Sequence, residues 1–157
     1  MKHVISVLVE NRSGVLARIA GLFSSRGFNI DSLAVGETED PTVSRMTITV
    51  KGDDKTLEQV KKQLNKLIDV IGVKDLTKKG FIGRELLLFR VKAAPADKAK
   101  IASFLEKNHA KILSSGANAV TVEFVGDQEH VVKVLDGLKD YGIEDIVRTG
   151  RVALAKE

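Results

Sequence analysis

The residues from Asn11 to Gly14 join a strand-like pattern to a helical one and form the best candidate site for binding chemistry. The backbone N–H groups of Gly14, Val15 and Leu16 would open that helix without intrahelical partners, at the positive end of its dipole, where a carboxylate is favoured. Gly14 has no Cβ to hold a ligand away from the backbone. The amide oxygen of Asn11 can accept a hydrogen bond from an ammonium group. These groups match the two charged ends of a free α-amino acid.

A simple helix cap explains the same residues without any ligand. In that interpretation Ser13 is the N-cap, because its hydroxyl can accept a bond from an N–H of the first turn, and Gly14 is merely tolerated. The residues alone leave both interpretations open.

Residue types that carry out catalysis are sparse elsewhere in the chain. There is no cysteine, which excludes thiolate metal sites and cysteine nucleophiles. His3, His109 and His130 fall in different elements, and none has a second ligand at metal spacing. The glycine-rich dinucleotide and P-loop patterns are absent. The sequence therefore predicts no active site, metal or cofactor in this chain, with any reacting groups on a partner.

Composition describes a protein with an aliphatic core and a mixed surface. Of the 157 residues, 43% are hydrophobic and only 4% aromatic, and the net charge is +4. The lysines are spread along helix faces instead of forming basic blocks, so we expect no nucleic-acid partner. No apolar run approaches the roughly 18 residues of a membrane span, and no signal peptide is visible. We expect a cytoplasmic protein that does not bind membranes, which the lack of cysteine also suits.

Alternating and helical patterns predict six elements in the first half. Strands are expected over 3–10, 28–36, 45–50 and 70–77, and helices over 15–27 and from 53 to about 68. The order is the split β-α-β plan, in which right-handed crossovers place both helices on one face of an antiparallel sheet. The other face, which carries Thr47 and Thr49, is expected to be uncovered.

The same order repeats in the second half. Strands are expected over 85–92, 111–113, 119–125 and 143–147, and helices over 95–107 and from 127 to about 140, followed by a tail over 149–157. The sequence thus predicts an α+β protein of two ferredoxin-like βαββαβ domains. Their expected bounds are 1–78 and 85–157, with a linker over 79–84.

Several strings match one protein family in order and spacing. They are ISVLVEN at 5–11, GVLAR at 14–18, GLF at 21–23, RGFNIDSL at 26–33, DPT at 40–42, SRMT at 44–47 and QLNKL at 63–67. The first half resembles an ACT domain, and specifically that of the small regulatory subunits of acetolactate (acetohydroxyacid) synthase. A generic ACT domain would not share RGFNIDSL or SRMT. The second half is similar through RELLL at 84–88 and RTGRVAL at 148–154, and departs from the family at 108–110 and 114–115.

The resemblance implies a regulatory subunit without an active site. Such subunits bind a large catalytic subunit that holds thiamine diphosphate, Mg²⁺ and FAD, raise its activity, and confer feedback inhibition by valine, leucine or isoleucine, with valine the first expectation. It further implies a homodimer through the ACT domain, with the effector between two copies. Carried over by position, the contacts are Asn11, Gly14, Val15 and Leu16 of one chain with Asn29 and Ile30 of the other.

Three other functions fit parts of the pattern. A free-standing ACT-domain sensor of another enzyme would share the turn and the topology. An RNA-binding module would use exposed aromatics on its central strands, and strands 3–10 and 45–50 carry none. An acylphosphatase-like hydrolase could use Arg12 as a phosphate clamp, but no second residue supports it.

Overall fold

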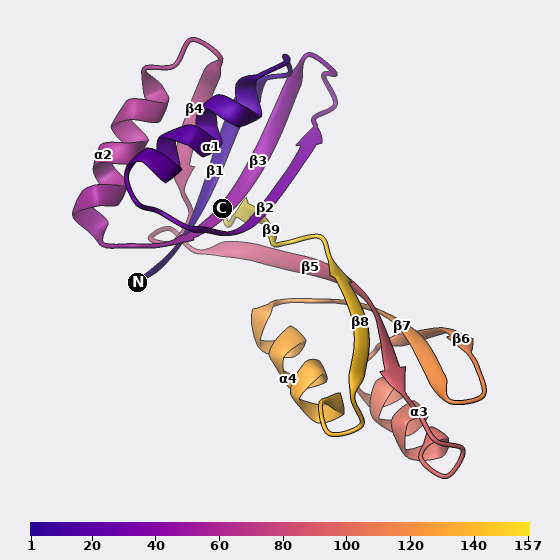
Figure 1. The fold of residues 1–157 in the computed structure, drawn as a ribbon. Helices are drawn as coiled ribbons and strands as arrows, with labels where there is room; N and C mark the ends of the chain where they lie inside the picture. The colour runs from indigo at the N-terminus through magenta and orange to yellow at the C-terminus, as the bar shows by residue number, and fades with distance from the viewer. The chain divides into compact units, whose positions relative to one another are not determined.

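A computed structural model describes all of residues 1–157 as two compact units (Figure 1). The first unit comprises Met1–Ile82 together with Arg151–Glu157, and the second comprises Gly83–Gly150. Each unit is an antiparallel sheet with two helices on one face. The predicted α+β class with two ferredoxin-like units is confirmed.

The first unit has the predicted order of strands and helices. Its elements are β1 (Lys2–Glu10), α1 (Val15–Ser25), β2 (Ile30–Glu37), β3 (Val43–Lys51), α2 (Asp54–Asn65) and β4 (Val70–Asp75). The strand order is β2-β3-β1-β4, so β2 and β4 are the edges. This order follows from two crossover connections that each skip over a neighbouring strand.

The core of the first unit is built from alternating apolar residues in the strands and apolar residues at helical spacing in the helices. Alternate residues of β1, among them Ile5 and Val7, are fully buried under the helices. The buried positions of α1 are Val15, Ile19 and Phe23, which recur at the helical spacing of four. Alternation in the strand and the four-residue spacing in the helix therefore meet in one apolar layer.

The second unit repeats this plan. Its elements are β5 (Phe81–Lys92), which begins in the first unit, α3 (Lys98–Lys107), β6 (Lys111–Ser115), β7 (Ala119–Gly126), α4 (Gln128–Leu138) and β8 (Ile143–Arg148). The strand order β6-β7-β5-β8 matches that of the first unit. Phe89 and Phe124 are the aromatic members of its otherwise aliphatic buried core, and Phe104 and Tyr141 pack against that core.

The predicted tail over 149–157 is wrong, because the chain forms a further strand there. This strand, β9 (Val152–Ala155), pairs with β5. The backbone N–H of Lys156 donates to the carbonyl of Gly80 at 3.2 Å. Residues 151–157 thus cluster in space with the first unit, although they follow residues 85–148 in the chain.

The Thr-rich face of the first sheet is covered, in contrast to the expectation that it is open. Thr47 and Thr49 are only 4% and 1% exposed. Thr49 pairs with Ser32 of β2 on one side and with Val4 of β1 on the other, so the three residues form a row across the sheet.

The segment that begins at Arg151 crosses this row. The backbone N–H of Arg151 donates to the hydroxyl of Ser32 at 3.4 Å. Two residues later, Ala153 packs against Val4 and Leu76 in a small separate apolar cluster. Strand β9 therefore covers the sheet face that the helices leave free.

Candidate functional site

Helix α1 begins at Gly14 without a side-chain cap. Gly14 is the N-cap residue and has a left-handed backbone, with φ of 85°, a conformation that glycine adopts without steric cost. No side chain hydrogen-bonds to the first turn, and that turn contains no acidic residue. Ser13 is therefore not the N-cap, and the first turn of α1 carries no negative side chain of its own to complement the helix dipole.

The side chain of Asn11 is held by both of its amide protons. Its Nδ2 donates to the carbonyl of Pro41 at 2.9 Å and to Oε1 of Glu37 at 3.2 Å. The backbone N–H of Asn11 donates to the carbonyl of Thr42 at 2.7 Å. The amide oxygen is the remaining polar atom of the side chain, and it can only accept hydrogen bonds.

The loop that receives Asn11 is itself stabilised by Asp40. The hydroxyl and the backbone N–H of Thr42 both donate to this carboxylate. These two bonds hold the pKa of Asp40 below its usual value. The loop is thus fixed in the conformation that presents the Pro41 carbonyl to Asn11.

The side chains of the turn divide between core and surface. Val15 is 3% exposed and belongs to the core, so only its backbone can contact a ligand. Leu16 is 45% exposed and can offer an apolar side chain. The backbone N–H of Val15 donates to the carbonyl of Arg12 at a long 3.4 Å, so a ligand would have to compete with this bond.

Arg18 brings a positive charge to the same turn, which sequence reasoning did not foresee. A Cβ built on Gly14 would lie 3.6 Å from Nη1 of Arg18. The Arg18 guanidinium also pairs with Asp69, and both residues line a shallow hollow with Lys66, Leu67 and Ile68. The signal available in the sequence was the spacing of four between Gly14 and Arg18, which stacks them on one side of a helix.

Asn29 and Ile30 lie at the other end of the sheet. Ile30 pairs with Val50, which also pairs with His3 at the start of β1, whereas Asn11 follows the end of β1. The eight residues of β2 span about 25 Å at a rise of about 3.3 Å per residue. A single chain therefore does not bring Asn29 and Ile30 together with Asn11 and Gly14.

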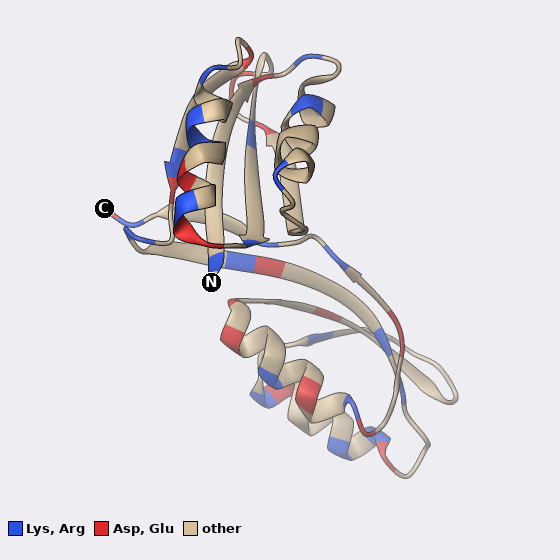
Figure 2. Ribbon diagram, turned by 60° about the vertical axis from the view of Figure 1, so that its left-hand side comes forward, with Lys and Arg blue, Asp and Glu red and all other residues tan.

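The histidines and acidic residues do not converge elsewhere. His3 is buried with Nε2 3.1 Å from the carbonyl of Gly52, and His130 contacts the helix-capping Asp127. No group of three or more histidine or acidic side chains is placed to hold a metal ion. Basic and acidic residues are interleaved along α2, α3 and α4, whereas α1 carries Arg18 and no acidic residue (Figure 2). None of the helices has the length and apolarity to span a bilayer.

Both halves of the chain match the same protein family. The family model of the AHAS small subunit-like ACT domain matches residues 5–72, and the model of the small subunit of acetolactate synthase matches residues 84–157. The chain is 49% identical over 156 residues to a probable acetolactate synthase small subunit of Archaeoglobus fulgidus, covering 99% of this chain and 98% of that one. It is 41% identical over 157 residues to the acetolactate synthase small subunit of Bacillus subtilis, covering 99% and 91%.

A solved structure shows the same fold over the whole chain. The small subunit of acetolactate synthase from Thermotoga maritima superimposes with a TM-score of 0.89 at 38% sequence identity, and the match covers 100% of this chain and 98% of that one. Both sequence identity and fold therefore extend across the two units. The chain belongs to the family of acetolactate synthase small subunits.

Proposed function

We propose that this chain is the non-catalytic regulatory subunit of an acetolactate synthase. It activates a large catalytic subunit that carries thiamine diphosphate, Mg²⁺ and FAD, and it mediates feedback inhibition by a branched-chain amino acid, with valine the first candidate. The family membership supports the pairing with a catalytic subunit. The observation that carries the effector site is the uncapped start of α1 at Gly14 beside the fixed amide of Asn11.

A free amino acid suits this turn because each of its charged ends has a counterpart. The effector carboxylate would bind the first N–H groups of α1 at Gly14, Val15 and Leu16, where the dipole and the nearby Arg18 favour negative charge. The ammonium would donate to the amide oxygen of Asn11. This oxygen points away from Pro41 and Glu37, because the amide nitrogen donates to both of them. Exclusion of water from such a site lowers the local dielectric constant, which strengthens both contacts.

The second half of the site would come from another copy of the chain. Strand β2 is an edge, so its backbone groups can pair with a second β2. Antiparallel pairing about a two-fold axis sets the start of one β2 beside the end of the other. Glu37 ends β2 and accepts a bond from Asn11. Asn29 and Ile30 of the second copy would therefore lie near Asn11 and Gly14 of the first.

This arrangement makes effector binding depend on chain pairing. Ile30 of the second copy would supply the apolar wall for a branched side chain. An amino acid that contacts both copies binds only the paired geometry, and by linkage it stabilises that geometry over others. The catalytic subunit would then respond to the state of the paired ACT domains.

Reconstitution with a catalytic subunit tests the proposal. Acetolactate formation is measured with the catalytic subunit alone, after addition of this chain, and after further addition of valine, leucine or isoleucine. We expect activation by the chain and its reversal by at least one amino acid. Absence of both effects would overturn the proposal. Calorimetric binding of an amino acid without activation would instead favour a free-standing ACT-domain sensor of another enzyme.

A further inference from the structure

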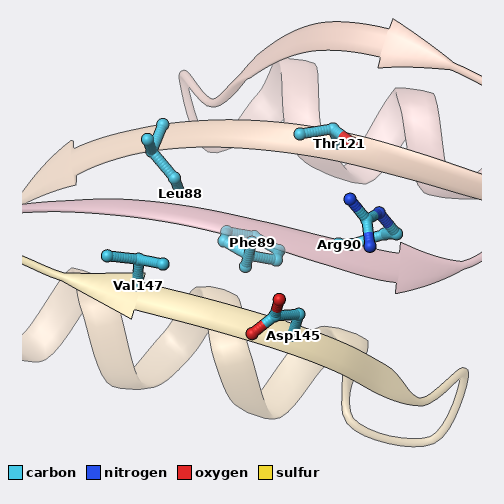
Figure 3. Close-up of a pocket in the computed structure, with 6 residues that line it drawn as sticks. All are labelled: Leu88, Phe89, Arg90, Thr121, Asp145 and Val147. Atoms are coloured by element: carbon cyan, nitrogen blue, oxygen red, sulfur yellow. The ribbon is translucent and has the colours of Figure 1, made fainter.

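The second unit carries an exposed apolar patch on the sheet face opposite its helices. Leu88 of β5 and Val147 of β8 are cross-strand partners on this face, and they are 39% and 64% exposed. Beside them is a shallow cavity of about 130 Å³, lined also by Arg90, Thr121 and Asp145 (Figure 3). That volume corresponds to several water molecules, enough for an aliphatic side chain.

Two oppositely charged side chains flank the cavity without forming an ion pair with each other. Arg90 and Asp145 are cross-strand partners two residues along from Leu88 and Val147, on the same face of the sheet. Figure 3 shows them side by side on neighbouring strands, yet neither side chain forms an ion pair or hydrogen bond within the structure. Opposite charges on a sheet face are therefore available to a partner that presents the complementary arrangement.

We propose that this face binds the same face of a second copy of the chain, with Val147 of each copy seated over Leu88 of the other and Arg90 of each paired with Asp145 of the other. A second copy is the partner because the patch is complementary to itself. A two-fold axis that runs along the strands between β5 and β8 lays β5 of one copy over β8 of the other. Under that operation the Leu88–Val147 and Arg90–Asp145 contacts each form twice, as an isologous interface requires.

The packing geometry is that of two aligned sheets. Sheets that meet face to face lie about 10 Å apart with their strands within about 30°, and their side chains interdigitate. The protruding Val147 and the adjacent cavity meet this requirement as knob and hole. The apolar pair would form the dry centre and the ion pairs its polar edge, the usual division in protein interfaces. This interface is distinct from the β2 edge and does not depend on any effector.

A cross-linking experiment on the full chain tests the contact. Because the chain lacks cysteine, Val147→Cys introduces a single thiol that a short bismaleimide can link to its counterpart across the axis. The matched control is Val132→Cys, since Val132 is 46% exposed on helix α4, away from this sheet face. We expect cross-linked dimers to form on the order of tenfold faster with the thiol at position 147. Equal rates would overturn the proposal.

Charge exchange identifies the partner as a second copy. In the Val147→Cys background, Arg90→Asp and Asp145→Arg each place like charges opposite one another, so each alone should lose the rapid cross-linking. An equal mixture of the two variants restores both ion pairs between unlike copies, and the double variant restores them between like copies. We expect both the mixture and the double variant to recover rapid cross-linking.

Two results would contradict the self-association. Failure of both the mixture and the double variant to recover cross-linking would assign the face to a different partner. Protection of the thiol by millimolar valine, leucine or isoleucine would assign the cavity to a free amino acid instead. Circular dichroism of each variant establishes that the unit is folded, and the exposed positions of the substitutions make that the expected result.

Discussion

The side-chain amide of Asn11 donates to the backbone carbonyl of Pro41 at 2.9 Å, which fixes the orientation of the amide group. Glu37 accepts from the same nitrogen. Both amide protons are thus directed toward the protein, and the oxygen remains as an acceptor. Aspartate has the same size but no N–H to donate to Pro41 and Glu37, so only the amide can make these two bonds and still present an oxygen.

Replacing Asn11 by alanine should weaken the response to the effector. A hydrogen bond to a charged group contributes about 1.5–3 kcal/mol, so the amino-acid concentration for half-maximal inhibition should rise by on the order of tenfold or more. The measurement is an inhibition titration of the reconstituted enzyme. Arg12→Ala is the matched control, because Arg12 is an exposed neighbour in the same turn. An equal loss in both variants would speak against a specific role for Asn11.

Gly14→Asp should abolish inhibition and leave activation by the chain intact. The new carboxylate would occupy the anion position and repel that of the effector. Its Cβ meets nothing closer than the guanidinium of Arg18 at 3.6 Å, and aspartate tolerates the left-handed backbone better than most residues.

Gly14→Ala separates the charge from the backbone strain. The alanine has the same Cβ and a left-handed penalty of about 1–2 kcal/mol, without the negative charge. The effector should therefore inhibit the enzyme with Gly14→Ala less strongly than the wild type and more strongly than the enzyme with Gly14→Asp. Calorimetric binding of the effector by Gly14→Asp would refute the proposed site.

The sequence pattern predicted the repeated order of elements, because each helix and strand carries its own hydrophobic period. It missed β9, since four residues are too few for a period and their partners β5, Val4 and Ser32 are distant along the chain. The burial of Thr49 escaped prediction for the same reason. A threonine is compatible with either an open or a covered sheet face, and the covering segment lies about 100 residues later in the chain.

The turn of the candidate site could be located from residue types, but its internal contacts could not. Asn11 and Gly14 are recognisable where a strand gives way to a helix. The ion pair of Arg18 with Asp69 joins residues 51 positions apart, and such a distance leaves no local pattern. The separation of Asn29 from Asn11 follows from topology alone, since β1 and β2 run in the same direction, each antiparallel to β3.

Removing Arg148 should destabilise the second unit. Its guanidinium makes two bonds to the Glu85 carboxylate, at 2.6 and 2.9 Å, and the Glu85 side chain is only 7% exposed. The Glu85 hydrogen bond raises the pKa of Arg148. Breaking a buried pair from one side costs about 3–5 kcal/mol. Because Arg148 is 42% exposed, we expect a loss of about 2–3 kcal/mol for Arg148→Ala in urea unfolding.

The cost should come from the charge that is left unpaired, so removing both charges should recover most of it. The double variant Glu85→Leu/Arg148→Met keeps apolar volume at both positions, and such replacements are often close to neutral. A double variant as unstable as Arg148→Ala would show that packing of the Arg148 stem, and not the charge, is responsible.

The capping of α2 by Asp53 should depend on pH. The N–H and the hydroxyl of Thr56 donate to its carboxylate at 2.8 and 2.9 Å and lower its pKa below the ordinary 3.8. A carboxyl with a lowered folded-state pKa stabilises the fold above its unfolded pKa and loses this contribution as the pH falls through the folded value.

Asp53→Asn isolates this effect because asparagine keeps an accepting oxygen and does not titrate. The stability advantage of the wild type over the variant should be constant near neutral pH and should shrink as the pH falls below about 4. Urea unfolding at a series of pH values measures it. A difference that stays the same across the acid range would contradict the assignment.

The return of residues 151–157 to the first unit affects how the chain folds during synthesis. A ribosome makes the whole of the second unit before it makes the segment that covers Ser32, Thr49 and Val4. The nascent first unit therefore exposes one face of its sheet for as long as that synthesis takes, a period in which unprotected sheet surface invites association with other chains. Cutting the chain at residue 83 would leave the same face bare permanently, so the first unit expressed alone as 1–82 should aggregate more readily than the intact protein.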